Sequence, residues 1–410
     1  MRGTGMHKKN RISDIDALRG FALFGILQVN ILAFSSVFYG TGLVFENARS
    51  GMDAVLAFLI SAVFELKFYL LFSFLFGYSV TLQMRSAEKA GAAYLPRMMR
   101  RQVGLLLIGS LHAMVLFHGD ILVTYAVLGL LLLLVRDWSN TAMLWLACVL
   151  LFVTSLFWFF AAYSQSGMPE QNTATILYDA QAAVTAYRGG PLSIVTQHIV
   201  DLQSFIPVLL LLQAPCAFAA FLIGFVVGRH NGLARPDHVQ KYRSRMLGWG
   251  FGIGLPGSLF YACATQFAPG TSLETAGLAV SILTAPFLTM AFMASILALL
   301  NTGKVNWSRD RLASAGRMAL TNYLMQSFVC AAIFHGYGFG FVDRISLTWT
   351  VCIAVGIFGL QVIISHWWMA RYAYGPVEWL LRSLTIGRWP QWKAGGVVTP
   401  HPADPSDRTG

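Results

Sequence analysis

The sequence predicts an all-α protein that crosses a membrane about ten times, with both termini in the cytoplasm. Three observations predict this class. Of 410 residues, 56% are hydrophobic and only 11% are charged, whereas soluble domains carry roughly 25% charged residues. Apolar runs long enough to cross a bilayer as helices recur along the whole chain. Basic residues gather in alternate loops, as they do on the cytoplasmic side of membrane proteins.

Ten apolar spans are predicted, with ends placed to within a few residues. They are residues 17–38, 53–84, 98–118, 120–135, 141–163, 203–228, 246–267, 275–300, 318–336 and 346–370. The second span is too long for one straight crossing, and Glu65 and Lys67 interrupt it. It is either a short amphipathic segment followed by a spanning helix or one tilted helix.

The orientation follows from the basic side chains. With the N-terminus in the cytoplasm, 25 of the 29 basic residues fall on that side, and Lys67 lies within a span. Arg49, Arg188 and Arg344 fall on the other side. Topology thus explains the net charge of +11 better than a nucleic-acid partner does.

Residues 1–394 are predicted to form one transmembrane domain. The longest loop, 164–202, lies outside the cytoplasm, where Gly189-Gly190-Pro191 separates two moderately apolar stretches. Such a segment is typically functional or a helix lying on the surface. The tail 395–410 is rich in Pro, Gly and Asp and is predicted to be disordered. The five cysteines lie in apolar runs without a CxxC pair, so neither a disulfide framework nor a metal site is expected.

Strongly polar side chains within spans need a partner or a cavity, because facing lipid costs several kcal/mol. The first such cluster is "DIDALRGFALFGILQVNI". Asp16 and Arg19 are three residues apart and can pair on a helix. The pair is either a structural anchor at the helix start or part of an anion or acyl-donor site at the cytoplasmic mouth. Asn30 lies about 16 Å further in and either lines a tunnel or bonds a neighbouring helix.

The second cluster is "ELKFYLLFSFLFGYS". Lys67 requires a counter-ion or an aqueous cavity, and Glu65 is too near in sequence to face it directly on a helix. A cation that lines a cavity is the favoured interpretation, and a structural pair is the alternative.

The third cluster is "SLHAMVLFHGDIL", residues 110–122. Gly119-Asp120 permits a turn between two spans, at the end away from the cytoplasm. His112 lies about two turns deeper, so a bond between His112 and Asp120 requires the turn to fold back. Asp120 is either the N-cap of the next helix or part of a site. His112 is either a neutral histidine bonded to a neighbouring helix or a general base, for which imidazole is suited.

The fourth cluster is "SAGRMALTNYLMQS", residues 314–327. Arg317, Asn322 and Tyr323 belong to a polar helix face that should point to the interior. The density of polar groups favours a lined pocket over packing alone.

Five segments together resemble the YeiB-like family of bacterial membrane proteins, known as a domain of unknown function. They are "DIDALRGFALFGILQVNI", "ELKFYLLFSFLFG", "HGDILVTYAVLGLLLLL", "AGRMALTNYLMQS" and "YGPVEWLLRSLTIGR". They occur in order over residues 14–388, and the C-terminal family region covers about 225–394. The resemblance implies a multi-pass protein of the bacterial cytoplasmic (inner) membrane.

The family is in turn similar to transmembrane acyltransferases, including the lysosomal heparan-glucosaminide N-acetyltransferase and acyltransferase family three. This similarity implies transfer of an acyl group, typically acetyl, from cytoplasmic acetyl-CoA or another acyl-CoA to an acceptor across the membrane. It places Arg19 and Lys67 near the donor's phosphates or thioester and Asn30 in the central tunnel. Arg317, Asn322 and Tyr323 are expected to line the donor pocket with them.

One departure affects the catalytic residue. Acyltransferase family three commonly has a histidine eleven residues after the helix-one arginine, and this chain has Asn30 there. No histidine occurs between residues 31 and 111, where the lysosomal branch has its own. His112 and Asp120 are therefore the predicted catalytic residues. His335 and His366 rank lower.

The favoured function is an acyltransferase whose partners are the lipid bilayer, acyl-CoA and an envelope saccharide or lipid-linked acceptor. The alternative is a small-molecule or proton-coupled transporter that uses Lys67, His112 and Asp120 as a relay. Against it, the sequence shows no paired Gly/Pro-broken helices in corresponding halves. The sequence does not determine the oligomeric state, and a homodimer is compatible with it.

Overall fold

A computed structural model describes residues 3–41, 51–167, 173–234, 236–302 and 306–393, and the predicted disordered tail lies outside them. The fold is all-helical, as predicted. The first half comprises α1 Gly3–Ser35, α2 Gly51–Leu59, the π-helix η2 Ile60–Phe64, α3 Lys67–Lys89, α4 Tyr94–Val115, α5 Leu122–Val135, α6 Asn140–Ser166 and α7 Thr173–Tyr187. The second half comprises α8 Pro191–Val208, η3 Leu209–Gln213, α9 Ala214–Arg229, η4 Gly232–Ala234, α10 Pro236–Trp249, η5 Gly250–Gly254, α11 Leu255–Phe267, α12 Ser272–Asn301, α13 Asn306–Arg317, α14 Ala319–Phe334, α15 Leu347–Met369 and α16 Pro376–Ile386.

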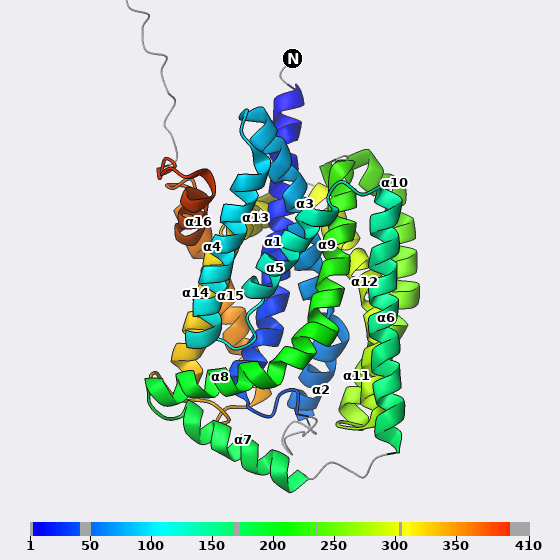
Figure 1. Ribbon diagram of the computed structural model, residues 1–410, viewed down its shortest axis with the longest axis vertical. Coiled ribbons are helices and arrows are strands. Elements are labelled where there is room, and N and C mark those ends of the chain that lie inside the picture. The colour runs from blue at the N-terminus through cyan, green and yellow to red at the C-terminus, as the bar shows by residue number, and fades with distance from the viewer. Residues whose placement is uncertain (1–2, 42–50, 168–172, 235, 303–305, 394–410) are drawn as a thin grey trace, which may run out of the picture.

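Six helical segments are long and apolar enough to cross a membrane, and α5 and α14 are shorter apolar helices. The six are Ser13–Ser35, Gly51–Lys89, Asn140–Ser166, Pro191–Arg229, Ser272–Asn301 and Leu347–Met369. Arginines near its start leave α4 outside this group although it runs parallel to its neighbours (Figure 1). The molecule is therefore a multi-pass membrane protein by the length and composition of its helices.

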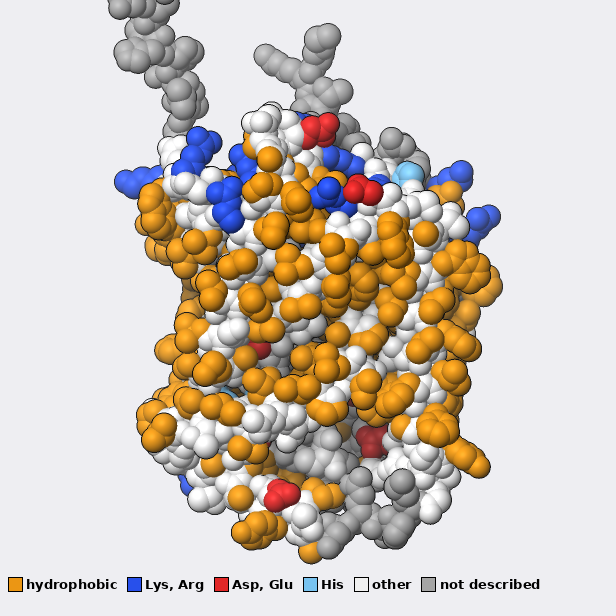
Figure 2. All heavy atoms as spheres, in the orientation of Figure 1, with side chains coloured by type: hydrophobic (Ala, Val, Ile, Leu, Met, Phe, Trp, Pro, Cys, Tyr) orange, Lys and Arg blue, Asp and Glu red, His pale blue; other side chains and the backbone are white. Residues whose placement is uncertain are grey.

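Two ends of the bundle differ in charge. Lysine and arginine side chains gather at the end that carries the start of α1, and an apolar surface lies between that end and the other (Figure 2). We call these the basic end and the distal end. At the distal end α7 and α8 lie across the bundle (Figure 1), which gives the 164–202 segment the surface-lying helix predicted for it. The turn between α7 and α8 contains Gly189-Gly190.

Helix α1 is the centre of the bundle. It contacts α3, α12, α13, α14 and α15. In the most apolar stretch of α1, 67% of the residues are buried inside the protein, whereas the corresponding share is 22% in α6 and in α15. A helix surrounded on all sides can carry polar groups that face other protein atoms, whereas α6 and α15 present mainly apolar side chains outward.

Long helical segments are interrupted near their middles, which the sequence indicated for the second predicted span and not for the 203–228 span. The Gly51–Lys89 segment contains η2 and then a break at Leu66, whose φ of +66° is rare for a residue with a side chain. The Pro191–Arg229 segment contains η3 just after Pro207. Short π-helical insertions of this kind are frequent at functional sites. The segment with Glu65 and Lys67 is thus a short helix followed by a long one.

Glycines set the closest helix crossings. A Cβ on Gly20 would lie 2.3 Å from the Leu312 carbonyl oxygen, and one on Gly316 would lie 1.8 Å from that of Asp16. The backbones of α1 and α13 therefore touch. Small residues allow such contacts in membranes, where packing and hydrogen bonds replace the hydrophobic effect between helices.

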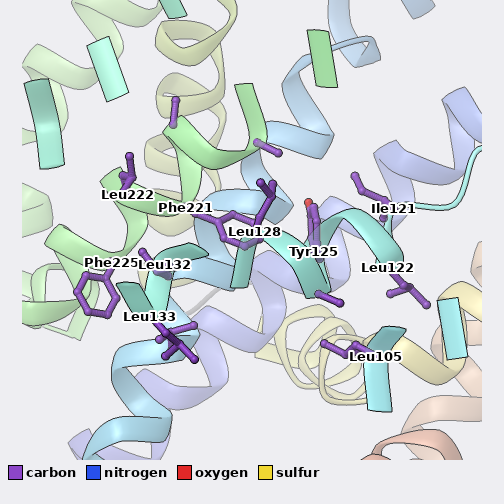
Figure 3. Packing of buried hydrophobic residues seen from close by; sticks show 14 of the residues in the cluster. Leu105, Ile121, Leu122, Tyr125, Leu128, Leu132, Leu133, Phe221, Leu222 and Phe225 are labelled. Carbon is purple, nitrogen blue, oxygen red and sulfur yellow. The ribbon is translucent and has the colours of Figure 1, made fainter. Parts of the chain in front are cut away.

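A cluster of apolar side chains joins α4, α5 and α9 beside this core. Tyr125 packs against Phe221 with ring centroids 5.0 Å apart, and Ile121 and Leu122 lie at the start of the same helix (Figure 3). The cluster fixes the position of α5, the helix that directly follows the turn with Asp120.

We expect Gly316→Ala to destabilise the protein, because its methyl group would overlap the α1 backbone. Overpacking typically costs roughly 1–3 kcal/mol. Unfolding of the purified protein in detergent, followed by circular dichroism, measures the loss. Gly356→Ala on α15 is the matched control, since a Cβ there meets nothing within 4 Å. Equal stability of the two variants would contradict the contact.

Candidate functional site

A cavity of about 420 Å³ opens at the basic end between α1, α3, α4, α5, α13, α14 and α16. Five arginines and one carboxylate lie in its wall: Arg19, Arg97, Arg101, Arg317, Arg382 and Glu378. Ile26 also lines it, seven residues after Arg19 on α1, so the cavity reaches about 10 Å into the bundle. Its inner wall is apolar and aromatic. The cavity is thus cationic at the mouth and apolar inside.

Arg19 is fixed by two side chains. It donates to Asp16 at 2.5 Å and to the Ser79 hydroxyl at 2.5 Å. The predicted Asp16–Arg19 pair therefore exists, and Arg19 also lines the cavity at the basic end. The contact between Gly20 and α13 places Arg317 beside this pair.

Arg101 carries a buried hydrogen-bond donor that has no partner. Its Nη1 is buried without a hydrogen-bond partner, and its guanidinium lies 5.0 Å from the centre of the Phe76 ring. Within the described residues Arg101 pairs with no carboxylate. The Tyr94 hydroxyl, also in the wall, is likewise buried without a partner. These donors are available to an anionic ligand.

Glu378, the carboxylate of the wall, has a structural role. One oxygen accepts hydrogen bonds from the backbone of Leu320 and Thr321, and the other accepts from the Thr321 hydroxyl. It thus satisfies free N–H groups at the start of α14. Burial raises the pKa of Glu378, and these hydrogen bonds act against that rise. The cavity as a whole stays positively charged.

His112 and Asp120 are in direct contact. The Nδ1 of His112 lies 2.8 Å from Oδ1 of Asp120, and both side chains are 1% exposed. The other oxygen of Asp120 accepts from the backbone of Val123 at 2.8 Å. The turn at Gly119 therefore folds back, and Asp120 both holds His112 and satisfies the start of α5.

The second imidazole nitrogen is free. Nε2 of His112 is buried and makes no hydrogen bond. A carboxylate on Nδ1 fixes the proton there and leaves a lone pair on Nε2, the arrangement of a general base with its orienting acid. The tautomer is inferred from the hydrogen bond.

Tyr323 connects the cavity with this pair. It lines the cavity, and its ring centre lies 5.1 Å from that of His112. Its hydroxyl is buried and makes no hydrogen bond of good geometry. His112 itself is not in the cavity wall, so Tyr323 stands between a ligand in the cavity and the His112 ring.

The remaining predicted donor residues lie elsewhere. Asn322 donates to the Ala315 carbonyl and the Ser365 hydroxyl, and thus joins α13, α14 and α15. Asn30 is half buried on α1 and is not in the cavity wall. The polar face of α14 is therefore divided: Tyr323 meets the cavity and Asn322 holds helices together.

Lys67 is a correction to the expected cavity-lining cation. Its side chain is fully buried and its ammonium donates to the Ser61 carbonyl at 2.8 Å, away from the basic-end cavity. The break at Leu66 leaves carbonyls of the preceding turn without helical donors, and Lys67 satisfies one of them. Glu65 instead accepts hydrogen bonds from Tyr39 and Tyr261. We leave Lys67 out of the donor site.

Sequence reasoning missed a polar cluster at the distal end. It comprises His118, Tyr187, His198, Asp201 and His335, which we call the distal cluster. The sequence ranks His335 and His366 below His112 as catalytic candidates. His335 belongs to the distal cluster, whereas His366 is exposed at the end of α15. The sequence feature that could have revealed the cluster is the polar content of the 164–202 segment, which contains Tyr187, His198 and Asp201.

We expect neutral His112 to hold its proton on Nδ1. Nitrogen NMR of histidine-labelled protein in detergent reports the tautomer, and His112→Gln assigns the signal by removing it. Asp120→Asn should shift the His112 signals, because the negative charge that holds the proton on Nδ1 is lost. A proton on Nε2 in the unchanged protein would contradict the hydrogen bond as described.

Comparison with known proteins identifies the family of the chain but not an activity. The model of a protein family of unknown function, DUF418, matches residues 227–388. "Uncharacterized protein YxaH" of Bacillus subtilis is 32% identical over 394 residues, which cover 92% of this chain and 95% of that protein. "Uncharacterized protein YeiB" of Escherichia coli is 27% identical, covering 91% and 95% respectively. No solved structure matches. The resemblance noted from the five segments is confirmed: the chain belongs to the DUF418 family, with bacterial relatives along its full length.

Proposed function

We propose that the protein is a membrane acyltransferase. It takes an acyl group from acyl-CoA at the basic end, and the family resemblance makes this group acetyl. It delivers this group to a saccharide or lipid-linked acceptor of the cell envelope at the distal end. One observation carries the proposal: a cavity with five arginines at its mouth leads inward to Tyr323, which contacts a buried His–Asp pair with a free nitrogen.

The proposal includes a topology. The basic end faces the cytoplasm, because the basic residues of a membrane protein are retained there. Ten crossings, counting α4, α5, α14 and the α10–α11 segment with the six long ones, return the chain to the side where it began. Each of the ten spans predicted from the sequence contains a helix. The protein would then reside in the bacterial cytoplasmic membrane with both termini inside.

The donor fits the cavity by charge and polarity. Acyl-CoA carries several phosphate charges at one end and an uncharged thioester arm at the other. Arginine binds phosphate through paired N–H donors, and Arg101 has such a donor free. The apolar interior accepts the arm, which brings the thioester toward Tyr323 and His112.

The chemistry then needs a base. Nε2 of His112 accepts the proton of an acceptor hydroxyl or amine while the acceptor atom attacks the thioester carbonyl carbon. The bond from that carbon to sulfur breaks, and the CoA thiolate takes the proton from the imidazolium. Asp120 keeps His112 oriented and stabilises its charged form, as orienting carboxylates do for catalytic histidines.

Arg101→Gln should weaken binding of CoA at least tenfold, because one desolvated phosphate contact is lost. Arg100→Gln is the matched control: it removes the same charge one residue away, from an exposed side chain outside the cavity wall. Isothermal calorimetry of the purified protein with CoA and acetyl-CoA makes the comparison. Absence of CoA binding to the unchanged protein, across acyl chain lengths, would overturn the donor site.

His112→Gln should abolish transfer while leaving donor binding within about twofold. Loss of a general base typically lowers kcat by about 10²–10⁴. Transfer of radiolabelled acetyl from acetyl-CoA to envelope lipid extracts is the measurement, and His366→Gln, an exposed position, is the control. A His112→Gln protein that transfers at the unchanged rate would remove His112 from the mechanism.

One observation favours a transporter as the second candidate. Two 39-residue segments, Gly51–Lys89 and Pro191–Arg229, are each interrupted by a π-helix, and interrupted helices mark substrate sites in many transporters. Their α3 and α9 parts pack together through Gly77 and Gly224. Uptake of solutes into proteoliposomes without CoA would favour this function over the acyltransferase.

A further inference from the structure

The last part of the described chain packs around stacked aromatic rings at the basic end. It comprises the end of α15, α16 and the residues that follow α16 up to Lys393, and we call it the C-terminal platform. The Trp379 ring of α16 is its centre, with the ring centres of Trp389 and Trp392 at 4.8 and 4.7 Å. A backbone bridge between Tyr372 and Lys393 closes the platform. The chain after α16 is therefore held in a defined place.

Helix α16 lies where the arginines at the start of α4 give way to an apolar run. A Cβ on Gly104 of α4 would lie 3.3 Å from the Leu384 side chain of α16. A Cβ on Gly387, which follows α16, would lie 2.8 Å from Nη1 of Arg100. Figure 1 shows α16 at the outer edge of the bundle, beside α4. This level corresponds to the headgroup layer of a bilayer that surrounds the apolar surface.

The two faces of α16 differ in what they contact. One face belongs to the wall of the cavity at the basic end, through Leu381 and Arg382. On the outward side Leu380 and Leu384 are 43% and 45% exposed, and Trp389 beyond the helix is 70% exposed. Apolar side chains cover this part of the surface, next to lysine and arginine side chains (Figure 2). Such a helix is typical of one that lies in the interface of a membrane.

The charges of the platform are almost all positive. Arg371, Arg388 and Lys393 are exposed, and none of them forms an ion pair within the described part of the chain. The Arg371 guanidinium lies 4.4 Å from the centre of the exposed Trp367 ring. The acidic residue of the platform, Glu378, is directed onto the start of α14. Three free cations therefore surround the aromatic rings without a competing carboxylate.

We propose that the C-terminal platform binds anionic phospholipids of the leaflet at the basic end. The exposed leucines of α16 and Trp389 lie among the acyl chains, while Arg371, Arg388 and Lys393 contact the headgroup phosphates. Clustered basic residues beside a membrane attract anionic lipids, and a zwitterionic headgroup would bring its own cation against the three. This site does not depend on the proposed acyltransferase function. Because α16 also forms part of the cavity wall, the bound lipid supports that wall from outside.

Fluorescence quenching by lipids with brominated acyl chains tests the site with the full-length protein in nanodiscs. The nanodiscs contain phosphatidylglycerol and phosphatidylcholine in equal amounts, with bromine on one lipid or on the other. The difference between the unchanged protein and Trp389→Phe isolates the signal of Trp389. We expect brominated phosphatidylglycerol to quench this signal at least twofold more than brominated phosphatidylcholine, because the anionic lipid is enriched beside the platform.

Replacing Arg371, Arg388 and Lys393 together by glutamine should bring the ratio of the two quenching efficiencies to about one. The matched control replaces Lys241, Arg243 and Arg245 by glutamine, which removes three exposed charges from α10 at the same end. It should keep the preference, because α10 is not part of the platform. About 1 M sodium chloride should abolish the preference of the unchanged protein, since the Debye length then falls to about 3 Å.

Equal quenching of Trp389 by the two lipids in the unchanged protein would overturn the proposal. So would a preference that survives the triple replacement, or one that the α10 control removes as well. Quenching by neither lipid would show that the face is covered by something else, such as a second copy of the chain, and would equally sink the lipid site. Thermal unfolding of each variant checks that it is folded, and the salt measurement tests the charge dependence without any substitution.

Discussion

The structure depends on helices that touch backbone to backbone at glycines. Apolar side chains gain little by leaving lipid for one another, so close packing has to hold the bundle together. Gly20 and Gly316 join α1 to α13, while Gly77 and Gly224 join α3 to α9. Arg19 precedes the first of these glycines and Arg317 follows the second, so the contact that holds the helices also sets the spacing of two cavity arginines. The helix packing and the cavity wall are therefore coupled at the same residues.

The turn between α4 and α5 shows a similar coupling. Gly109 lies against Val123 and Asp120, where a Cβ would come within 3.0 Å of the carboxylate. This close approach lets Asp120 reach both the Val123 backbone and the His112 ring. An isolated buried carboxylate would be costly, and two hydrogen bonds reduce that cost. The pair is thus held by packing on one side and by helix capping on the other.

Local patterns predicted the elements well and their partners poorly. Each predicted span contains a helix, because hydrophobic length alone specifies one in a membrane. The sequence posed Asp120 as either a helix cap or a site residue. In the structure one carboxylate oxygen caps α5 through Val123 and the other bonds His112. The sequence indicated an interruption near Glu65 and Lys67, but it did not show that the break at Leu66 would leave a carbonyl of the preceding turn for the Lys67 ammonium.

The other features that the sequence did not predict depend on contacts between helices that are distant in the chain. Asn322 and Tyr323 are adjacent in the chain, yet the first bonds to α15 and the second faces the cavity. Adjacent helical residues differ by about 100° in direction, so the role of each depends on which neighbours surround α14. The distal cluster was missed for the same reason: its members come from four segments whose proximity only the fold reveals.

His112 lies between two aromatic rings, Tyr323 toward the basic end and Phe117 toward the distal end. A protein that passes a group across a membrane has to connect two compartments without opening a path for ions. Rings on both sides of a dry histidine meet this requirement, because each can admit a reacting group while the other still closes the route. The free nitrogen of His112 is buried, as the proposed transfer requires. A base open to water on either side would let protons through and would favour hydrolysis of the thioester over transfer.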